Sequence, residues 1–233
     1  SCRGNSERGP GLILQFLANG LCKGAIFAIV ALGFGLIYTT TRVFHIAHAA
    51  VCVIAGYTLY LSTASWGLPL TIGIPLALLV AMAAGMLTDL IVYQPLARRS
   101  ASVAVVLISS LGVQIILENV ISLAFGSQTK ILREGIDQTV AFGDVVLTHV
   151  QVAQLLVCVG LTTGFWLFLK HTRVGQVCRA VSDDEDLAAV LGVRVSRVRS
   201  LAFALGSLMA GTGGVLIALD VGMDPHIGFP IVL

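Results

Sequence analysis

Long apolar runs recur along the whole chain. A helix of about 20 apolar residues crosses the roughly 30 Å hydrocarbon layer of a bilayer, so runs of that length bounded by charge, Gly or Pro predict transmembrane helices. The sequence holds six such runs, at about 12–41, 45–62, 70–93, 103–125, 150–169 and 201–219. The first is long and has a weak point near Gly20 and Gly24, which predicts either two consecutive helices or one strongly tilted helix. The pattern predicts an all-α membrane protein, a polytopic transmembrane helix bundle of about six spans.

Composition supports this fold class. Hydrophobic residues make up 57% of the 233 positions and charged residues only 11%, whereas about a quarter of a soluble domain is charged. A net charge of +2 gives no support for nucleic-acid binding. We expect residues 1–11 to be a polar leader or expression remnant and residues 12–233 to form the transmembrane domain. Three of the five cysteines, Cys22, Cys52 and Cys158, fall inside apolar runs without a CxxC pair, which indicates packing residues.

The positions of Lys and Arg predict the orientation, because short cytoplasmic loops are enriched in them. Of the fourteen, nine follow the first, third or fifth run: Arg42, Arg98, Arg99, Lys170, Arg173, Arg179, Arg194, Arg197 and Arg199. The opposite side holds Arg3, Arg8, Lys130 and Arg133, and Lys23 lies within the first run. The amino terminus is therefore predicted outside, with an external loop at 126–149 and a cytoplasmic loop at 170–200.

The cytoplasmic loop contains an acidic stretch that ends at Gly192. It predicts a short helix, in which Ser182 or Asp183 is the N-cap, the acidic residues face the positive dipole end, and Gly192 is the left-handed stop. Leu187 and Leu191 lie one turn apart and form an apolar pair on a charged loop. Such a pair predicts either docking into a groove of a partner or a surface helix that folds back on its own protein.

Four separated motifs share a resemblance. They are the stretch 172–181 with the acidic helix after it, His-Ile-Ala-His-Ala at 45–49, Tyr-Gln-Pro-Leu at 93–96 with two following arginines, and Asp-Pro-His-Ile-Gly at 224–228. In this order, and on these sides of the membrane, they resemble the branched-chain amino-acid permease family of ABC importers. The chain departs from that family at His45, where Asn is usual, and at Ala49, where Gly is usual. Similar proteins continue through further hydrophobic segments, so a C-terminally incomplete chain is expected.

The resemblance implies partners and a role for the acidic helix. In that family this helix couples the permease to a cytoplasmic ATPase, which assigns the role here to Asp183, Asp184, Glu185, Asp186, Leu187, Leu191 and Gly192. The chain has no GxxxxGK[ST] phosphate loop, so ATP and Mg are expected on a separate subunit and no cofactor on this chain. The implied partners are a second homologous permease subunit, two ATPase subunits and an external solute-binding protein. The implied location is the bacterial inner membrane.

Few polar residues fall inside the apolar runs, and each is a functional candidate because an unpaired charge in the bilayer is costly. His48, Gln114, Glu118 and Asn119 are candidates for the translocation path. His45 and His48 share a helix face, but two histidines make a poor metal site. Lys23 and Glu118 carry opposite charges, which predicts either an intramembrane ion pair or two side chains that reach the outer interface separately.

Small residues at Gly206, Ala210 and Gly214 predict close helix packing in the last run. The substrate is left open among branched-chain amino acids, other amino acids, amides and urea. Two other classes remain, a passive small-solute channel and an intramembrane enzyme. The channel has no use for a capped acidic helix, and the enzyme lacks support because neither GxSxG nor HExxH is present.

Overall fold

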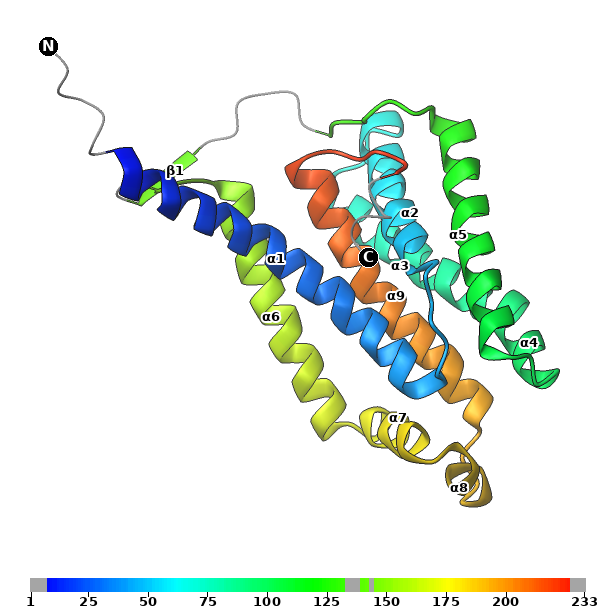
Figure 1. Cartoon of the computed structure of the whole chain (residues 1–233). Helices are drawn as coiled ribbons and strands as arrows, with labels where there is room; N and C mark the ends of the chain where they lie inside the picture. Colours follow the sequence, from blue (N-terminus) through cyan, green and yellow to red (C-terminus); the bar gives the residue numbers. More distant parts are fainter. Residues whose placement is uncertain (1–7, 133–138, 143–144, 227–233) are drawn as a thin grey trace, which may run out of the picture.

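Helices form nearly all of the described structure. The computed structural model describes residues 8–132, 139–142 and 145–226. The elements, shown in Figure 1, are α1 (Arg8–Thr41), α2 (His48–Tyr60), η1 (Leu61–Ser65), α3 (Leu70–Thr88), η2 (Asp89–Tyr93), α4 (Gln94–Arg98), α5 (Val103–Phe125), β1 (Thr139–Phe142), β2 (Val145–Thr148), α6 (His149–His171), α7 (Arg173–Asp183), α8 (Glu185–Val190) and α9 (Val195–Asp220). The two η segments are π-helical turns that continue α2 and α3.

Five helical stretches in the described ranges are long and apolar enough to cross a membrane. They are Leu12–Thr41, Leu70–Arg98, Val103–Phe125, His149–His171 and Val195–Asp220. The predicted fold class is therefore confirmed. The first apolar run forms one uninterrupted 34-residue helix, so the alternative of two consecutive helices is wrong.

The sixth predicted span, 45–62, is not among those five. Its helix, α2, has 13 residues and begins only at His48, because the chain from Arg42 to Ala47 is not helical. Ten of these 13 residues are buried. A helix that is enclosed by other helices in this way belongs to the core and has little contact with lipid.

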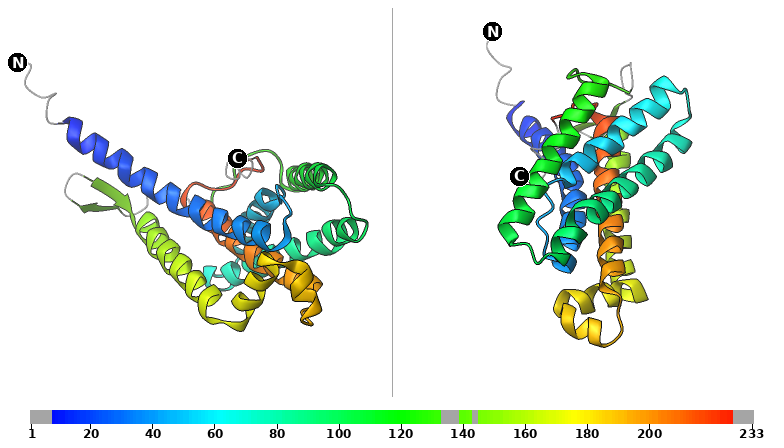
Figure 2. Two further views of the ribbon diagram at one scale, coloured as in Figure 1. Left: turned by 60° about the horizontal axis from the view of Figure 1, so that its bottom comes forward. Right: turned by 90° about the vertical axis from the view of Figure 1, so that its right-hand side faces the viewer.

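The long helices alternate in direction. In Figure 1, α1, α3 and α6 descend toward the end that carries α4, α7 and α8, while α2, α5 and α9 return. The views in Figure 2 show α9 at the centre of the bundle and α5 and α6 at its margins. The main core joins side chains of α1, α2, α3 and α9. The arginine-rich loops therefore meet at one end, as their charge predicted.

Small residues let other helices approach α9 closely. Gly33 of α1 faces Gly206, and a Cβ added to Gly206 would lie 2.7 Å from the Gly33 carbonyl oxygen. A Cβ at Gly214 would overlap the backbone of Cys52 in α2, and one at Gly85 of α3 would overlap the side chain opposite. Because the contacts at Gly206 and Gly214 involve backbone atoms, only small residues fit there. The packing role predicted for the small residues of the last run is confirmed.

A two-stranded antiparallel hairpin precedes α6, in a region predicted only as a loop. β1 and β2 pair with Thr139 opposite Thr148. The side-chain amide of Gln15 in α1 donates to the Val146 carbonyl and accepts from the Val146 N–H, both at 2.8 Å. These two bonds satisfy one edge position of β2 and attach the hairpin to α1.

Candidate functional site

The acidic helix predicted within the loop at 170–200 forms, but a residue other than the predicted ones is its N-cap. α7 continues through Asp183, so Asp184 is the N-cap of α8 and its carboxylate accepts from the Leu187 N–H at 2.9 Å. The prediction of Ser182 or Asp183 as the cap is wrong. Gly192 has φ of +88°, as predicted for the left-handed stop. Glu185 and Asp186 occupy the first turn, where the helix dipole favours negative charge.

The outer face of α8 is apolar. Leu187 and Leu191 are 57% and 76% exposed, and Val190 between them is 84% exposed. Ala188 points the other way and is buried. The helix therefore packs on its own protein through Ala188 and presents three large apolar side chains outward. Val190 is an additional member of this face, and its place one residue before Leu191 is the signal in the sequence that indicates it.

A small core supports α8. Cys178 and Val181 of α7, Ala188 of α8 and Val198 of α9 form this cluster. Burial raises the pKa of the Cys178 thiol. The thiol therefore remains protonated at neutral pH and acts as a packing group.

Hydrogen bonds attach α7 to the ends of two long helices. The Arg179 guanidinium donates to the Leu169 carbonyl at the end of α6. The Ser182 hydroxyl donates to the Thr39 carbonyl of α1 at 2.9 Å, and Arg42 Nη2 donates to the Ser182 carbonyl at 3.1 Å. Ser182 thus connects α7 to α1 and does not cap α8.

A polar stripe runs along the face of α5 that meets α2. Its members, Ser110, Gln114 and Glu118, are spaced four residues apart and so lie on one face. The Ser110 hydroxyl accepts from the Ala47 N–H at 3.3 Å, and Gln114 Oε1 accepts from the Ala50 N–H at 2.8 Å. The first N–H groups of a helix have no partner within it, and Ala47 cannot cap α2. Gln114 and Ser110 therefore supply, from another helix, the cap that α2 lacks.

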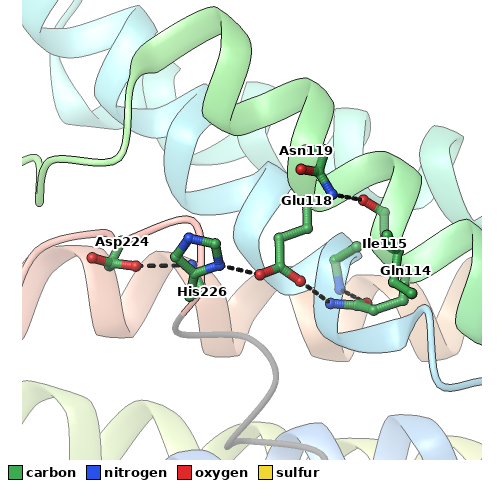
Figure 3. Close-up of polar contacts among 7 residues, drawn as sticks. Gln114, Ile115, Glu118, Asn119, Asp224 and His226 are labelled. Atoms are coloured by element: carbon green, nitrogen blue, oxygen red, sulfur yellow. Dashed lines mark hydrogen bonds and ion pairs between the residues drawn. The ribbon is translucent and has the colours of Figure 1, made fainter.

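Glu118 lies near the other end of this stripe. Figure 3 shows its carboxylate between Gln114 Nε2, at 3.5 Å, and His226 Nδ1. Asn119 turns toward its own helix, where its amide donates to the Ile115 carbonyl at 2.7 Å.

The structure does not bring Lys23 to Glu118. The ion-pair partner of Glu118, within the described ranges, is His226, and Lys23 is exposed on α1. The predicted ion pair between Lys23 and Glu118 is absent from this part of the chain. His226 was overlooked as the partner because it lies 108 positions from Glu118 in the sequence.

His45 lies in the non-helical stretch before α2 and His48 is the first residue of α2, and both side chains are fully buried. The prediction that the two share a helix face is wrong, because His45 is not helical. His48 Nε2 lies 3.3 Å from the Val30 carbonyl oxygen of α1. His45 Nδ1 lies 2.8 Å from the Tyr93 hydroxyl, which donates to Ser110 at 2.8 Å. No group of three His, Cys, Asp or Glu side chains in the described ranges could hold a metal ion. Tyr93 belongs to the Tyr-Gln-Pro-Leu motif, and the sequence did not reveal its contact with His45.

Comparison with known proteins identifies the family of this chain. The family described as "Branched-chain amino acid transport system / permease component" matches residues 16–233. The chain is 28% identical to the high-affinity branched-chain amino acid transport system permease protein BraD of Pseudomonas aeruginosa, over 93% of this chain and 74% of that protein.

Two further relatives have similar coverage. The permease protein LivH of Escherichia coli K12, from a high-affinity branched-chain amino acid transport system, is 29% identical over 93% of this chain and 74% of its own length. A probable LivH of Methanocaldococcus jannaschii is 26% identical over 94% of this chain and 70% of its own length. No solved structure matches the chain. With a helical bundle, five apolar spans and a family match over residues 16–233, the chain belongs to the branched-chain amino acid transport permease family.

Proposed function

We propose that this chain is the translocating permease subunit of an ATP-driven importer for branched-chain amino acids or related small solutes. Three relatives are named as branched-chain amino acid permeases, which favours that substrate class over urea and short-chain amides. Hydrolysis of ATP belongs to a separate ATPase, which carries the nucleotide and Mg. The chain itself is a permease and not an enzyme.

The apolar face of α8 carries this proposal. Leu187, Val190 and Leu191 are exposed at the arginine-rich end, on a helix that is capped at Asp184 and stopped at Gly192. An exposed apolar face at the tip of a soluble protrusion is unfavourable in water and favours docking with a partner. Asp183, Glu185 and Asp186 surround this face with charge. The proposed partner is a pair of cytoplasmic ATPase subunits.

The hydrogen bonds of α7 to α1 and α6 would transmit a displacement of α8 to the membrane-spanning helices. α7 and α8 share a core, and α7 is hydrogen-bonded to the ends of α1 and α6. Displacement of α8 during nucleotide-driven closure would therefore move both helices. A second homologous permease subunit would enclose the path, and a solute-binding protein would deliver the substrate outside, at the bacterial inner membrane.

The path itself is proposed along the polar groups of α5 and α2. Gln114 and Glu118 supply polar contacts on one face of α5, with Asn119 beside them and His48 at the start of α2. Such contacts should be weak, because tight binding at the path would trap the solute. Selectivity is then expected mainly in the solute-binding protein.

Charge on the apolar face of α8 tests the assignment. We expect the double variant Leu187→Asp, Leu191→Asp to insert normally and to lose copurification with the ATPase by at least tenfold, because buried unpaired charge opposes docking. Val221→Asp is a matched control, since Val221 is 56% exposed at the opposite end of α9. Retained copurification of the double variant would show that α8 is not the docking element.

Uptake of labelled leucine, isoleucine and valine tests the substrate class. Cells with the chain and its partners should accumulate at least one of the three when ATP is present, and excess urea or acetamide should not compete. Uptake that persists after ATP depletion would support the passive channel instead.

A further inference from the structure

A hydrogen-bonded cluster joins the cytoplasmic ends of α3 and α9. Asp89 Oδ2 accepts from Gln94 Nε2 and from the Ser200 hydroxyl, both at 2.9 Å. Gln94 Nε2 lies equally close to the Ser200 hydroxyl, and the Ser196 hydroxyl donates to Gln94 Oε1 at 3.3 Å. Ser196 and Ser200 are four residues apart and so lie on one face of α9. We name Asp89, Gln94, Ser196 and Ser200 the α3–α9 clamp.

The clamp is built around a buried carboxylate. Asp89 is 0% exposed and Gln94 is 8% exposed. Hydrogen bonds to an ionised acceptor are stronger than those between neutral groups, and a buried charge that loses its partners is strongly destabilising. Asp89 is also the first residue of the π-helical turn η2, and such turns often mark functional sites.

The first turns of α9 lie between the α3–α9 clamp and the core that α9 shares with α7 and α8. Val198 is buried in the core shared with α7 and α8, and Val195 packs against that core. Ser196 and Ser200, from the same two turns, reach Gln94 and Asp89. Only residues 191–194 separate α8 from α9. A displacement of α8 therefore acts on a helix start that is hydrogen-bonded to η2 and α4.

We infer that the clamp makes the cytoplasmic ends of α3 and α9 move as one unit when α8 is displaced, with Asp89 as its central positioning residue. This inference rests on the proposed function. Without the clamp, α8 would still dock and α9 would still move, but α3 would follow only through its apolar contacts. Transport would then be uncoupled from ATP hydrolysis, while assembly with the ATPase would persist.

The test uses the whole transporter, reconstituted with its ATPase and binding protein in proteoliposomes. Leucine uptake per ATP hydrolysed should fall about fivefold in Ser196→Ala, Ser200→Ala, because substitutions along a coupling network change the coupling by about two- to thirtyfold. Asp89→Asn, which removes the charge but keeps the shape, should show about a twofold fall. Ser200→Thr retains the hydroxyl and should keep the parental ratio.

Thr88→Ala is the matched control. Thr88 precedes Asp89 and is buried, but its hydroxyl donates to the Ala84 carbonyl of its own helix at 2.8 Å. We expect this control to keep the parental uptake per ATP. Unchanged uptake per ATP in the double serine variant, or an equal fall in Thr88→Ala, would overturn the inference.

A distance measurement separates this inference from the proposed function. Spin labels at the exposed positions Ala97 of α4 and Arg197 of α9 should report one narrow distance distribution in the parent, with and without ATP. The double serine variant should give a broad or shifted distribution when ATP is added. Equal distributions in both proteins would refute the clamp. Absence of ATP-dependent uptake of leucine, isoleucine and valine alike in the parent would refute the proposed function alone.

Discussion

The helices α9 and α5 are both apolar enough to cross a membrane, yet they occupy opposite environments. Within their most apolar windows, 78% of α9 is buried inside the protein and only 17% of α5. Hydrophobicity does not separate them, because lipid is as apolar as a protein core. The difference lies in the shapes of their side chains and in the positions of their few polar groups.

α9 carries small residues where it contacts other helices, whereas α5 carries bulky ones. Small residues let the backbone of α9 approach α1, α2 and α3, as at Gly206, Gly211 and Gly214. α5 instead exposes bulky side chains to its surroundings, including Ile108, Ile116 and Leu123. A helix with small residues on several faces gains contact with several neighbours, whereas a bulky surface packs as well against lipid as against protein.

α5 contacts the bundle through its polar stripe and through Ile121 and Phe125, which join the main core. Ser110 and Gln114 are buried and cap α2, while the adjoining faces of α5 are apolar and exposed. Backbone approach thus attaches α9, and side-chain hydrogen bonds attach α5. The two helices should accordingly respond to different substitutions.

The largest effect is expected for Gly214→Ala in α9. The added methyl would overlap the backbone of Cys52, which cannot move aside as a side chain can, so we expect a loss of about 3 kcal/mol of stability. The same change at Gly112 of α5 meets nothing within 4 Å and should change stability by less than about 1 kcal/mol. Thermal unfolding in detergent compares the two. Equal losses would show that close backbone approach does not distinguish these helices.

The second-largest effect is expected when the cap that α5 supplies to α2 is removed. Gln114→Leu would leave the buried Ala50 N–H without a partner and should cost about 2 kcal/mol. Asn119→Leu is the control, because the Asn119 amide bonds only within α5 and its loss should cost less than about 1 kcal/mol. The measurement is the same unfolding midpoint, and a larger loss for Asn119→Leu would contradict the capping role of Gln114.

The smallest effect is expected for substitutions of the charged residues Glu118 and Lys23. Glu118→Gln should change stability by less than about 1 kcal/mol, since the partner ring of His226 is 64% exposed and exposed pairs contribute little. Because Lys23 and Glu118 do not meet, the effects of Lys23→Glu and Glu118→Lys should add within about 0.5 kcal/mol in the double variant. Recovery of insertion or transport in the double reversal would reinstate the Lys23–Glu118 pair and exclude the arrangement seen here.

The acidic helix α8 shows where sequence reasoning succeeds and where it stops. Gly192 as the stop and the exposure of Leu187 and Leu191 follow from local pattern, and the structure confirms both. The cap was misplaced, because the Ser182 hydroxyl bonds to Thr39, 143 positions away. A local rule weighs only neighbours in sequence and cannot detect such a competing partner.

The same limit explains the polar groups in the bundle. Ala47 looks like an uncapped helix start, and nothing near it indicates that Ser110 and Gln114 complete it from α5. The opposite charges of Lys23 and Glu118 predicted an ion pair, but the Glu118 carboxylate contacts His226 instead.

The sequence by itself determined that this protein is a helical membrane bundle, where its main apolar spans fall and which loops carry the arginines. These properties follow from transfer free energies that add residue by residue, independently of which helices become neighbours. Only the tertiary structure decided that α9 is central and α5 marginal, that α5 caps α2, and that Asp89 reaches Ser200. These choices depend on the fit of surfaces and on the direction of hydrogen bonds between distant segments, which no single segment contains.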